Sequence, residues 1–151
     1  MSVAIVNRQT RHRLDRPAVR ALVSAILADH GREDAEVSVV AATDAFVHRL
    51  NLAYRSVDAA TDVLSFGGPL RARGRKAGGG PEPVLGDVVV STDRAAAQAR
   101  ERGVPFRSEM LALVAHGVLH LLGYDHEKAA DRRRMALLEE RYLRPLSRGS
   151  R

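Results

Sequence analysis

Apolar positions follow two spacings along the chain, and the spacing changes several times. Short runs rich in valine, isoleucine or leucine predict strands, because β-branched side chains pack well on a pleated sheet. Stretches in which apolar residues recur every three or four positions predict helices with one buried face. Strands are expected at 3–6, 37–42, 61–66 and 84–91, and helices at about 17–29, 44–54, 93–102, 108–122 and 127–143. The alternation predicts helices layered on a sheet, in which mixed strand directions are plausible.

Polar residues near the starts of two of these helices suit the caps that helices require. Pro17 suits the first helical position, with Asp15 or Arg16 before it. Thr92 or Asp93 can cap the alanine-rich helix that follows the last strand. The expected helix starts therefore have a local chemical basis.

Residues 67–83 depart most from either spacing. The segment contains three consecutive glycines, three prolines and four basic residues, a composition typical of loops. We interpret it as a long exposed loop rather than a linker between domains, because neither flanking half holds enough apolar residues for its own core. The chain is therefore predicted to form a single domain over 1–151, with a basic tail at about 145–151.

Composition narrows the class of protein. Of the 151 residues, 45% are apolar and 28% are charged, which is typical of a globular protein. The chain has no cysteine, which excludes disulfide bonds and thiolate metal sites. No apolar run approaches the ~20 residues of a membrane span, and the N-terminus lacks the apolar segment of a signal peptide. We therefore expect a cytoplasmic protein with no membrane partner.

The formal net charge of +6 comes almost entirely from arginine. Arginine suits the recognition of phosphate groups, so the charge raises the expectation of a nucleic-acid partner. A GC-rich coding sequence would produce the same excess of arginine and alanine, and charge alone leaves both explanations open. Aromatic residues make up only 4% of the chain, which predicts a small contribution from base stacking.

Three histidines are close together in the last third of the chain. His116 and His120 are four residues apart, so in a helix both project from one face. Gly123 can end that helix in a left-handed conformation and reverse the chain, which would bring His126 back toward the other two. Three imidazoles suit zinc and leave a fourth position open for water or substrate, as catalytic sites require. The pattern predicts a metal site at the end of a helix.

The same spacing matches the zinc-peptidase pattern H-E-x-x-H-x-x-G-x-x-H at every position but one. Gly117 stands where those enzymes have the glutamate that serves as general base. A peptidase of that design would therefore lack its base. The remaining histidines are interpreted as structural, with His48 in the core and His12 and His30 on the surface.

Three segments together resemble the YbeY family of bacterial endoribonucleases, which act in ribosomal RNA maturation. They are Asn51-Leu52-Ala53-Tyr54-Arg55 with Thr61-Asp62-Val63-Leu64-Ser65-Phe66, then Leu85-Gly86-Asp87-Val88-Val89-Val90, and then the histidine segment 116–126. Their order and spacing agree with the family over about 51–126. Two stretches depart from its pattern: 57–60 lacks the usual Lys-Asp-x-Pro-like sequence, and glycine rather than proline follows the phenylalanine.

The resemblance implies an α+β fold, with one small mixed four-stranded sheet flanked by four to five helices. It implies that His116, His120 and His126 bind one divalent metal ion. Zinc is expected, with nickel or another transition metal as the alternative, because imidazoles accept several metals. The resemblance further implies that Arg55 lines the same cleft and binds RNA, and that Arg55 and His116 act in catalysis.

The implied function is that of a metal-dependent endoribonuclease specific for single-stranded RNA. It would act in ribosomal RNA processing, including maturation of the 16S rRNA 3′ end, and in ribosome quality control, with the ribosome or its proteins as partners. A metal with an open position can polarise a phosphate oxygen or lower the pKa of bound water toward ~7. Arg55 can bind a second phosphate oxygen as negative charge develops.

Further RNA contacts are expected from the basic residues of the 67–83 loop. Such contacts to phosphates would give affinity with little sequence preference. The candidates are Arg71, Arg73, Arg75 and Lys76. Arg132, Arg133 and Arg134 on the last helix either add to this surface or only keep that face soluble.

The group that transfers the proton remains open at the level of the sequence. Asp62, Asp87 and Asp125 are candidates, and each also has a structural explanation. For example, Asp125 can orient a neighbouring ligand histidine. The nucleophile is either metal-bound water or the 2′-hydroxyl of the RNA.

Two other classes of function compete with the endoribonuclease. One is a different metallohydrolase, such as a peptidase or a deaminase. Gly117 disfavours the peptidase, and the absence of cysteine disfavours the zinc deaminase pattern. The other is a ribosome-assembly or RNA-binding factor whose metal is mainly structural.

Overall fold

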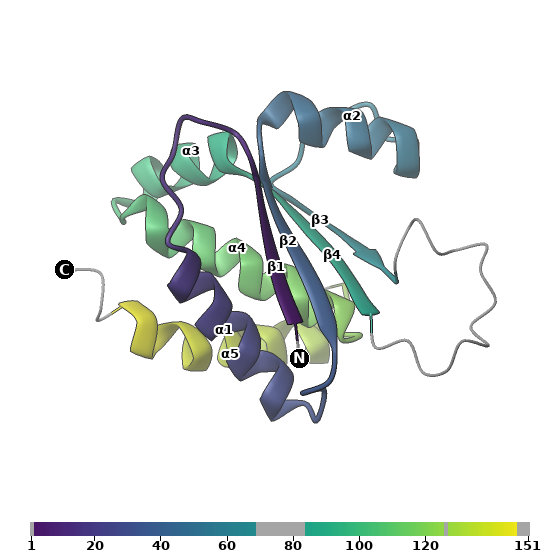
Figure 1. Ribbon diagram of the computed structural model, residues 1–151, viewed down its shortest axis with the longest axis vertical. Helices are drawn as coiled ribbons and strands as arrows, with labels where there is room; N and C mark the ends of the chain where they lie inside the picture. Colours follow the sequence, from purple (N-terminus) through teal and green to yellow (C-terminus); the bar gives the residue numbers. More distant parts are fainter. Residues whose placement is uncertain (1, 69–83, 126, 148–151) are drawn as a thin grey trace.

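The computed structural model describes residues 2–68, 84–125 and 127–147; strands and helices alternate in the first part of the chain, and only helices follow the last strand (Figure 1). All the predicted strands and helices are present, and the last strand has its predicted bounds. The strands are β1 (Ser2–Arg8), β2 (Glu36–Ala42), β3 (Val63–Gly67) and β4 (Val84–Ser91), and the helices are α1 (Arg16–Asp29), α2 (Asp44–Arg55), α3 (Thr92–Arg102), α4 (Phe106–Leu121) and α5 (Ala129–Ser147).

The four strands form one sheet in the order β1-β2-β4-β3. β1, β2 and β4 are parallel, and β3 runs antiparallel to β4 at the edge. The chain passes from β1 to β2 through α1, because parallel neighbours need a crossover connection. The sheet is therefore mixed, and the predicted α+β class is confirmed.

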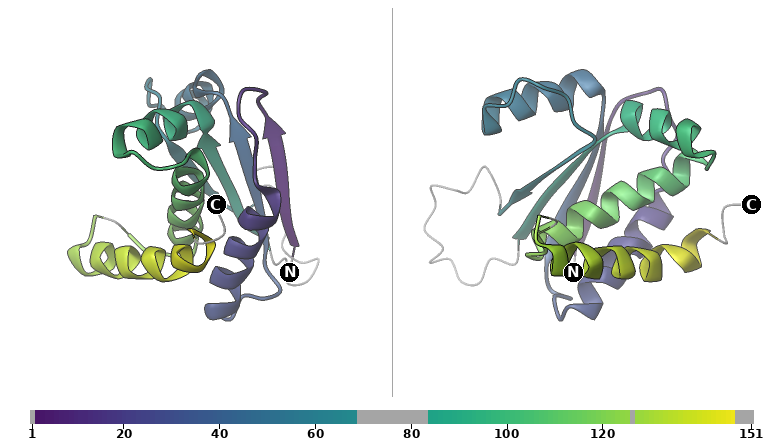
Figure 2. Two further views of the ribbon diagram at one scale, coloured as in Figure 1. Left: turned by 90° about the vertical axis from the view of Figure 1, so that its left-hand side faces the viewer. Right: turned by 180° about the vertical axis from the view of Figure 1, so that it is seen from behind.

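The main core lies on the face of the sheet that α1 and α4 cover, with α5 packed against these two helices (Figure 2). Val39 and Val88, which are opposite each other in β2 and β4, are at most 1% exposed. Leu22 of α1 and Val114 of α4 are fully buried in the same cluster. Burial of each such side chain contributes roughly 1.5–3 kcal/mol. α4, packed against both the sheet and α5, is therefore held firmly where the predicted metal ligands lie.

A smaller apolar cluster packs α2 against the opposite face of the sheet. Val47 of α2 contacts a surface formed by Leu64, Phe66 and Val89. In Figure 1, α2 lies across one end of the sheet and leaves the rest of that face uncovered by helices. This packing places the C-terminal end of α2, and with it Arg55, close to β3.

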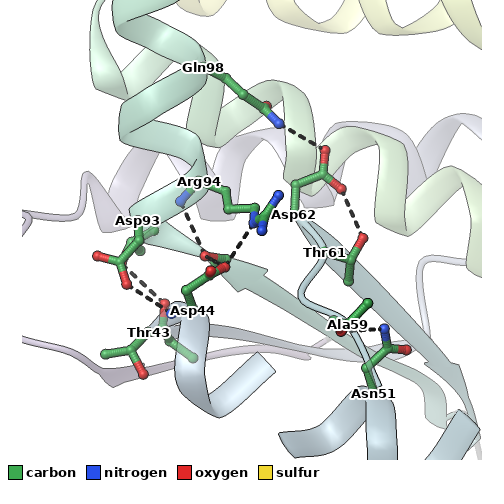
Figure 3. A network of polar contacts seen from close by, with 12 residues as sticks. Thr43, Asp44, Asn51, Ala59, Thr61, Asp62, Asp93, Arg94 and Gln98 are labelled. Atoms are coloured by element: carbon green, nitrogen blue, oxygen red, sulfur yellow. Dashed lines mark hydrogen bonds and ion pairs between the residues drawn. The ribbon is translucent and has the colours of Figure 1, made fainter. Parts of the chain in front are cut away.

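The N-terminus of α3 differs from the prediction. Ser91, rather than Thr92 or Asp93, is the N-cap, and its hydroxyl accepts a hydrogen bond from the amide of Arg94 at 3.2 Å. Thr92 instead donates to a carbonyl at the end of β2. Asp93 accepts from the amide of Asp44, the first residue of α2, at 2.8 Å (Figure 3). The predicted caps are wrong because both side chains make contacts between elements, which sequence neighbours do not reveal.

The ends of α1, α4 and α5 meet at one arginine. Asp15, one of the two residues expected before the helix, caps α1 and accepts from the amide of Ala18 at 3.1 Å, while the helix begins at Arg16, one residue before the predicted Pro17. Arg107 of α4 donates to Asp15 at 2.6 Å and to the carbonyl of Leu146 at 2.7 Å. This second contact supports the last turn of α5, which continues past Pro145 to residue 147. The predicted tail therefore begins too early, and residues 148–151 lie outside the described residues.

The predicted loop also begins too early, because Gly67 belongs to β3. The amide of Gly68 still donates to the carbonyl of Leu85 at 2.9 Å. Residues 69–83 lie outside the described residues, so the exposed loop and the domain limits 1–151 remain predictions. None of the helices in the described part of the chain is long and apolar enough to cross a membrane.

Candidate active site

A cleft of about 330 Å³ opens between α4 and the segment that joins α2 to β3. It combines two of the predicted metal ligands with the predicted arginine. Its lining residues are Asn51, Arg55, Val57, Thr61, Asp62, Val63, Leu64, Ser65, His116 and His120. A cavity of similar size, about 350 Å³, lies at the N-terminus of α4, but its lining is largely apolar and includes none of the predicted site residues. The cleft therefore differs from this cavity in its polar and ionisable lining residues and not in its volume.

Gly117 allows α4 to approach the sheet closely beside this cleft. A Cβ atom at this position would lie 2.5 Å from Cγ1 of Val88 and 3.2 Å from Oγ of Ser65. The Ser65 hydroxyl donates to the carbonyl of Gly117 at 3.0 Å, which fixes α4 against β3. A side chain at 117 would thus point into the sheet, so the glutamate of the zinc-peptidase pattern has no place here.

The two described histidines of the predicted metal site lie side by side on α4. The rings of His116 and His120 have centroids 6.4 Å apart and planes inclined by 14°. Nδ1 of His116 lies 3.1 Å from Oε2 of Glu139 on α5. An imidazole that donates its Nδ1 proton to a carboxylate presents the lone pair of Nε2, as metal-binding histidines usually do. The local structure therefore suits His116 as a ligand.

The electrostatics of the cleft favour a cation beside His116. The hydrogen bond that His116 donates to Glu139 raises the pKa of His116 above its usual value, against the opposing effect of burial. The charges of Glu139 and Asp62 act in the same direction. Imidazoles supported by a carboxylate fit zinc or another borderline divalent metal. Within 2–68, 84–125 and 127–147, no group of three or more possible ligands comes together, and the third predicted ligand, His126, lies outside these residues.

The chain reverses after α4 as predicted. Gly123 has a φ of +106°, which favours glycine, and its amide donates to the carbonyl of His120 at 3.0 Å. The hydroxyl of Tyr124 lies 2.9 Å from Nε2 of His30, at the end of α1. The turn that follows the two histidines is thus anchored to a second helix.

Arg55 is the last residue of α2 and is exposed at the cleft. Its Nη2 donates to the carbonyl of Ser65 at 2.7 Å, and its guanidinium carbon lies 5.6 Å from the centroid of the Phe66 ring. A guanidinium carries five N–H donors, so these contacts orient the group without exhausting its capacity to bind phosphate. The predicted position of Arg55 in the same cleft as the histidines agrees with this geometry.

Asn51 shapes the wall of the cleft opposite α4. It is 5% exposed, and its side-chain amide donates to the carbonyl of Ala59 at 2.9 Å (Figure 3). Its main-chain carbonyl accepts from the amide of Val57 at 3.1 Å. The chain turns back toward Asn51 after α2 because Ser56 adopts a left-handed conformation with a φ of +59°. Because Asn51 and Arg55 are four residues apart on one helix, they face the same side. One residue of the Asn-x-x-Tyr-Arg segment thus builds the cleft and another faces into it.

Of the three candidate acids, Asp62 is the one that lines the cleft. Its Oδ2 accepts from the side-chain amide of Gln98 at 3.2 Å (Figure 3). Asp87 lines a separate pocket between β1, β2 and the start of β4. Asp125 accepts from the amide of Glu127 at 3.0 Å, a contact within the turn after α4. The geometry therefore favours Asp62 as the acid that can meet a substrate.

The predicted basic contacts fall into two groups. Arg71, Arg73, Arg75 and Lys76 lie outside the described residues, so their role in RNA binding remains a prediction. Arg132, Arg133 and Arg134 are exposed on α5, which agrees equally with an RNA-binding surface and with a solvated face.

The prediction that His48 is a core residue is wrong. Its side chain is 43% exposed, and Nε2 lies 2.7 Å from Oδ1 of Asp58. The ring points from α2 toward the polar 56–60 segment instead of the sheet. His12 and His30 are half-buried rather than on the surface: His12 stacks on Phe106, and His30 contacts the turn after α4.

Sequence reasoning missed Glu139, which lies 23 residues beyond His116. A signal was present, because Met135, Leu138 and Tyr142 form the inward stripe of α5 and Glu139 lies beside it. A carboxylate at the edge of a buried stripe needs a partner. The pattern does not say which partner, since that depends on how α5 packs on α4.

The comparison with protein families gives one decisive match: the model described as Endoribonuclease YbeY matches residues 4–147. The chain belongs to the YbeY endoribonuclease family. A relative named Endoribonuclease YbeY from Anaeromyxobacter sp. (strain Fw109-5) is 44% identical over 144 residues, covering 95% of this chain and 71% of the relative. Another of that name, from Geobacter metallireducens, is 41% identical over 150 residues, covering 98% and 97% of the two chains.

The fold is also similar to that of a protein of known structure. The solution structure of TM1509 from Thermotoga maritima matches with a TM-score of 0.61 and 25% identity, covering 93% of this chain and 86% of that one. The family predicted from the sequence is therefore confirmed, and with it the prediction of an endoribonuclease.

Proposed function

We propose that this chain is a metal-dependent endoribonuclease that cleaves single-stranded ribosomal RNA in the cleft beside α4. The observation that supports the proposal is that His116, His120 and Arg55 line a single cleft. The two histidines can hold a metal ion, and a metal ion and a guanidinium both bind phosphate oxygens. One substrate in the cleft can therefore meet both groups. The resemblance to the family extends the proposal to 16S rRNA 3′-end maturation and ribosome quality control, in the cytoplasm and near the ribosome.

We assign His116, His120 and His126 as the metal ligands. Zinc is the expected metal, with nickel or another transition metal as the alternative, because the ligand set consists of imidazoles. When bound, a divalent metal would stabilise the negative charge that develops on a phosphate oxygen. The contact between His116 and Glu139 supports the assignment, because a carboxylate at Nδ1 orients the ring as it does in metal-binding histidines.

The residues around the ligands have separate tasks. Arg55, oriented by the carbonyl of Ser65, donates to a second phosphate oxygen, and this bond strengthens as charge develops. Asp62 lines the same cleft and is the candidate acid that can exchange a proton with a bound substrate. The loop residues Arg73, Arg75 and Lys76 are proposed to bind phosphates farther along the strand.

The function is tested most directly at Arg55. Arg55→Ala is expected to lower kcat/KM for a labelled single-stranded RNA by about 100-fold or more, as loss of one oriented donor to a developing charge typically does. Arg55→Lys should restore part of this loss, because it keeps the charge but not the planar fork. Cleavage is followed on gels for wild type, both variants and chelator-treated wild type.

Arg144→Ala is a matched control, because Arg144 is exposed on α5 and pairs with Glu140. It should cleave as wild type does. If wild type, Arg55→Ala and the chelated protein all cleave at one rate, the cleavage comes from a contaminating nuclease and the proposal is wrong.

The role of Glu139 is tested by metal affinity. Glu139→Gln is expected to weaken zinc binding by about 10- to 100-fold, the usual effect of losing a carboxylate that orients a ligand histidine. Competition with a coloured chelator measures this without any cleavage assay. Glu140→Gln is the control, since Glu140 is the exposed neighbour on α5 and pairs with Arg144. Equal zinc affinity in both variants would contradict the role of Glu139.

A further inference from the structure

Three exposed apolar side chains lie at or just after the C-terminal end of α2, and Val57 among them lines the cleft. Leu52 is 50% exposed, Tyr54 57% and Val57 45%. Elsewhere in the described part of the chain, only Val6, Val104 and Leu137 are large apolar side chains with comparable exposure. A scattered exposed aliphatic side chain is ordinary, but an exposed aromatic ring that packs beside an arginine of a functional cleft indicates a binding surface.

The aromatic ring in this group is held in place by the residues of the site. The ring of Tyr54 packs against that of Phe66 with centroids 5.8 Å apart and planes inclined by 71°. Phe66 is itself 7% exposed, and the guanidinium of Arg55 lies over it. Tyr54 is therefore anchored through a buried ring next to the arginine of the cleft, while more than half of its own surface stays accessible.

The charge around this ring determines what fits on it. The guanidinium of Arg55 lies over the ring of Phe66 on which Tyr54 packs. Toward the other end of α2, Arg8 and Arg49 flank Phe46, with guanidinium carbons 4.5 Å and 5.7 Å from that ring. A flat apolar surface next to a cation suits a ligand that combines planar rings with negative charge. A nucleotide has both, whereas an apolar protein surface would leave Arg55 without a countercharge.

We propose that Tyr54 is a stacking platform for an unpaired base of the RNA, adjacent to the nucleotide whose phosphate Arg55 binds. This inference rests on the proposed function and adds to it the group that recognises a single strand. A base inside a duplex is stacked on both sides and cannot offer its face, so the platform selects unpaired RNA. Because every base has such a face, it does so with little sequence preference. The scarcity of aromatic residues does not oppose this, since one ring in the right place is enough.

The chain has no tryptophan, which makes Tyr54→Trp a specific reporter. With the metal chelated to prevent cleavage, addition of a short oligoadenylate should quench the fluorescence of this variant. The same length of abasic ribose-phosphate strand should not quench it. Leu137→Trp, at a 68% exposed position of α5, is the matched control and should stay unquenched with either strand.

Affinity gives the second measurement. Tyr54→Ala is expected to bind oligoadenylate about tenfold more weakly than wild type, and Tyr54→Phe nearly as well as wild type, because stacking needs the ring and not the hydroxyl. All variants should bind the abasic strand equally. Affinity at the wild-type level in Tyr54→Ala, or a Tyr54→Trp signal unchanged by RNA, would overturn the platform even if wild type still cleaves RNA. Absence of both RNA binding and cleavage in wild type would instead overturn the proposed function.

Discussion

Replacing His120 by alanine is expected to lower zinc affinity by more than about 100-fold, because loss of a group that merely orients a ligand already costs up to that much. His120 lies on α4 with its ring nearly parallel to that of His116, and the variant would remove one of the three ligands that we propose. RNA cleavage should fall to the level of the chelated wild-type protein.

The metal content of purified protein is measured by elemental analysis, and zinc affinity by competition with a chelator. His12→Ala serves as control, because His12 stacks on Phe106 at the start of α4, away from the cleft residues. Circular dichroism of the metal-free proteins checks that both variants fold. Equal metal content in His120→Ala and wild type would show that the metal is bound elsewhere or not at all.

Gly117→Glu, which restores the zinc-peptidase pattern, is expected to prevent stable folding. The new Cβ would lie 2.5 Å from Cγ1 of Val88, a side chain with no exposed surface. Burying an unpaired carboxylate there costs several kcal/mol, out of a typical total stability of about 5–15 kcal/mol. We therefore expect no peptidase activity, because the side chain cannot reach the cleft without displacing α4 from the sheet.

Gly117→Ala tests the close contact between α4 and the sheet even if Gly117→Glu does not fold. Overpacking of about 1–3 kcal/mol is offset in part by the better helix propensity of alanine, about 1 kcal/mol, and a net loss of about 1 kcal/mol is expected in urea unfolding. Gly67→Ala is the control, because an added Cβ there meets no described atom within 4 Å. A Gly117→Glu protein with wild-type stability would contradict the close contact.

The sequence predicted the secondary structure well, because the signals are local. The valine-rich run of β4 and the periodic stripe of α1 need no knowledge of partners. The reversal at Gly123 was also predicted from chain chemistry alone. Errors occur where a side chain serves a distant element: Asp93 binds the start of α2 instead of capping its own helix, and His48 turns toward Asp58 rather than the core.

In the candidate site, too, local signals were predictable and contacts between distant elements were not. Spacing on one helix was enough to pair His116 with His120, and family motifs were needed to add Arg55. Neither could supply Glu139, because its contact depends on how α5 crosses α4. The exposure of Tyr54 depends likewise on the packing of α2 over β3. Contacts between elements far apart in the chain are therefore what the structure adds.

Ser65 takes part in both halves of the cleft. Its carbonyl accepts from Arg55 at 2.7 Å, and its hydroxyl donates to the carbonyl of Gly117, the residue that follows His116, at 3.0 Å. One residue of a paired strand thus sets the spacing between the guanidinium and the helix that carries the imidazoles. The conformational entropy of placing these groups is lost when the chain folds, not when RNA binds. We therefore expect the cleft to act as a preformed template, so that the RNA strand rather than the protein adjusts when the two bind.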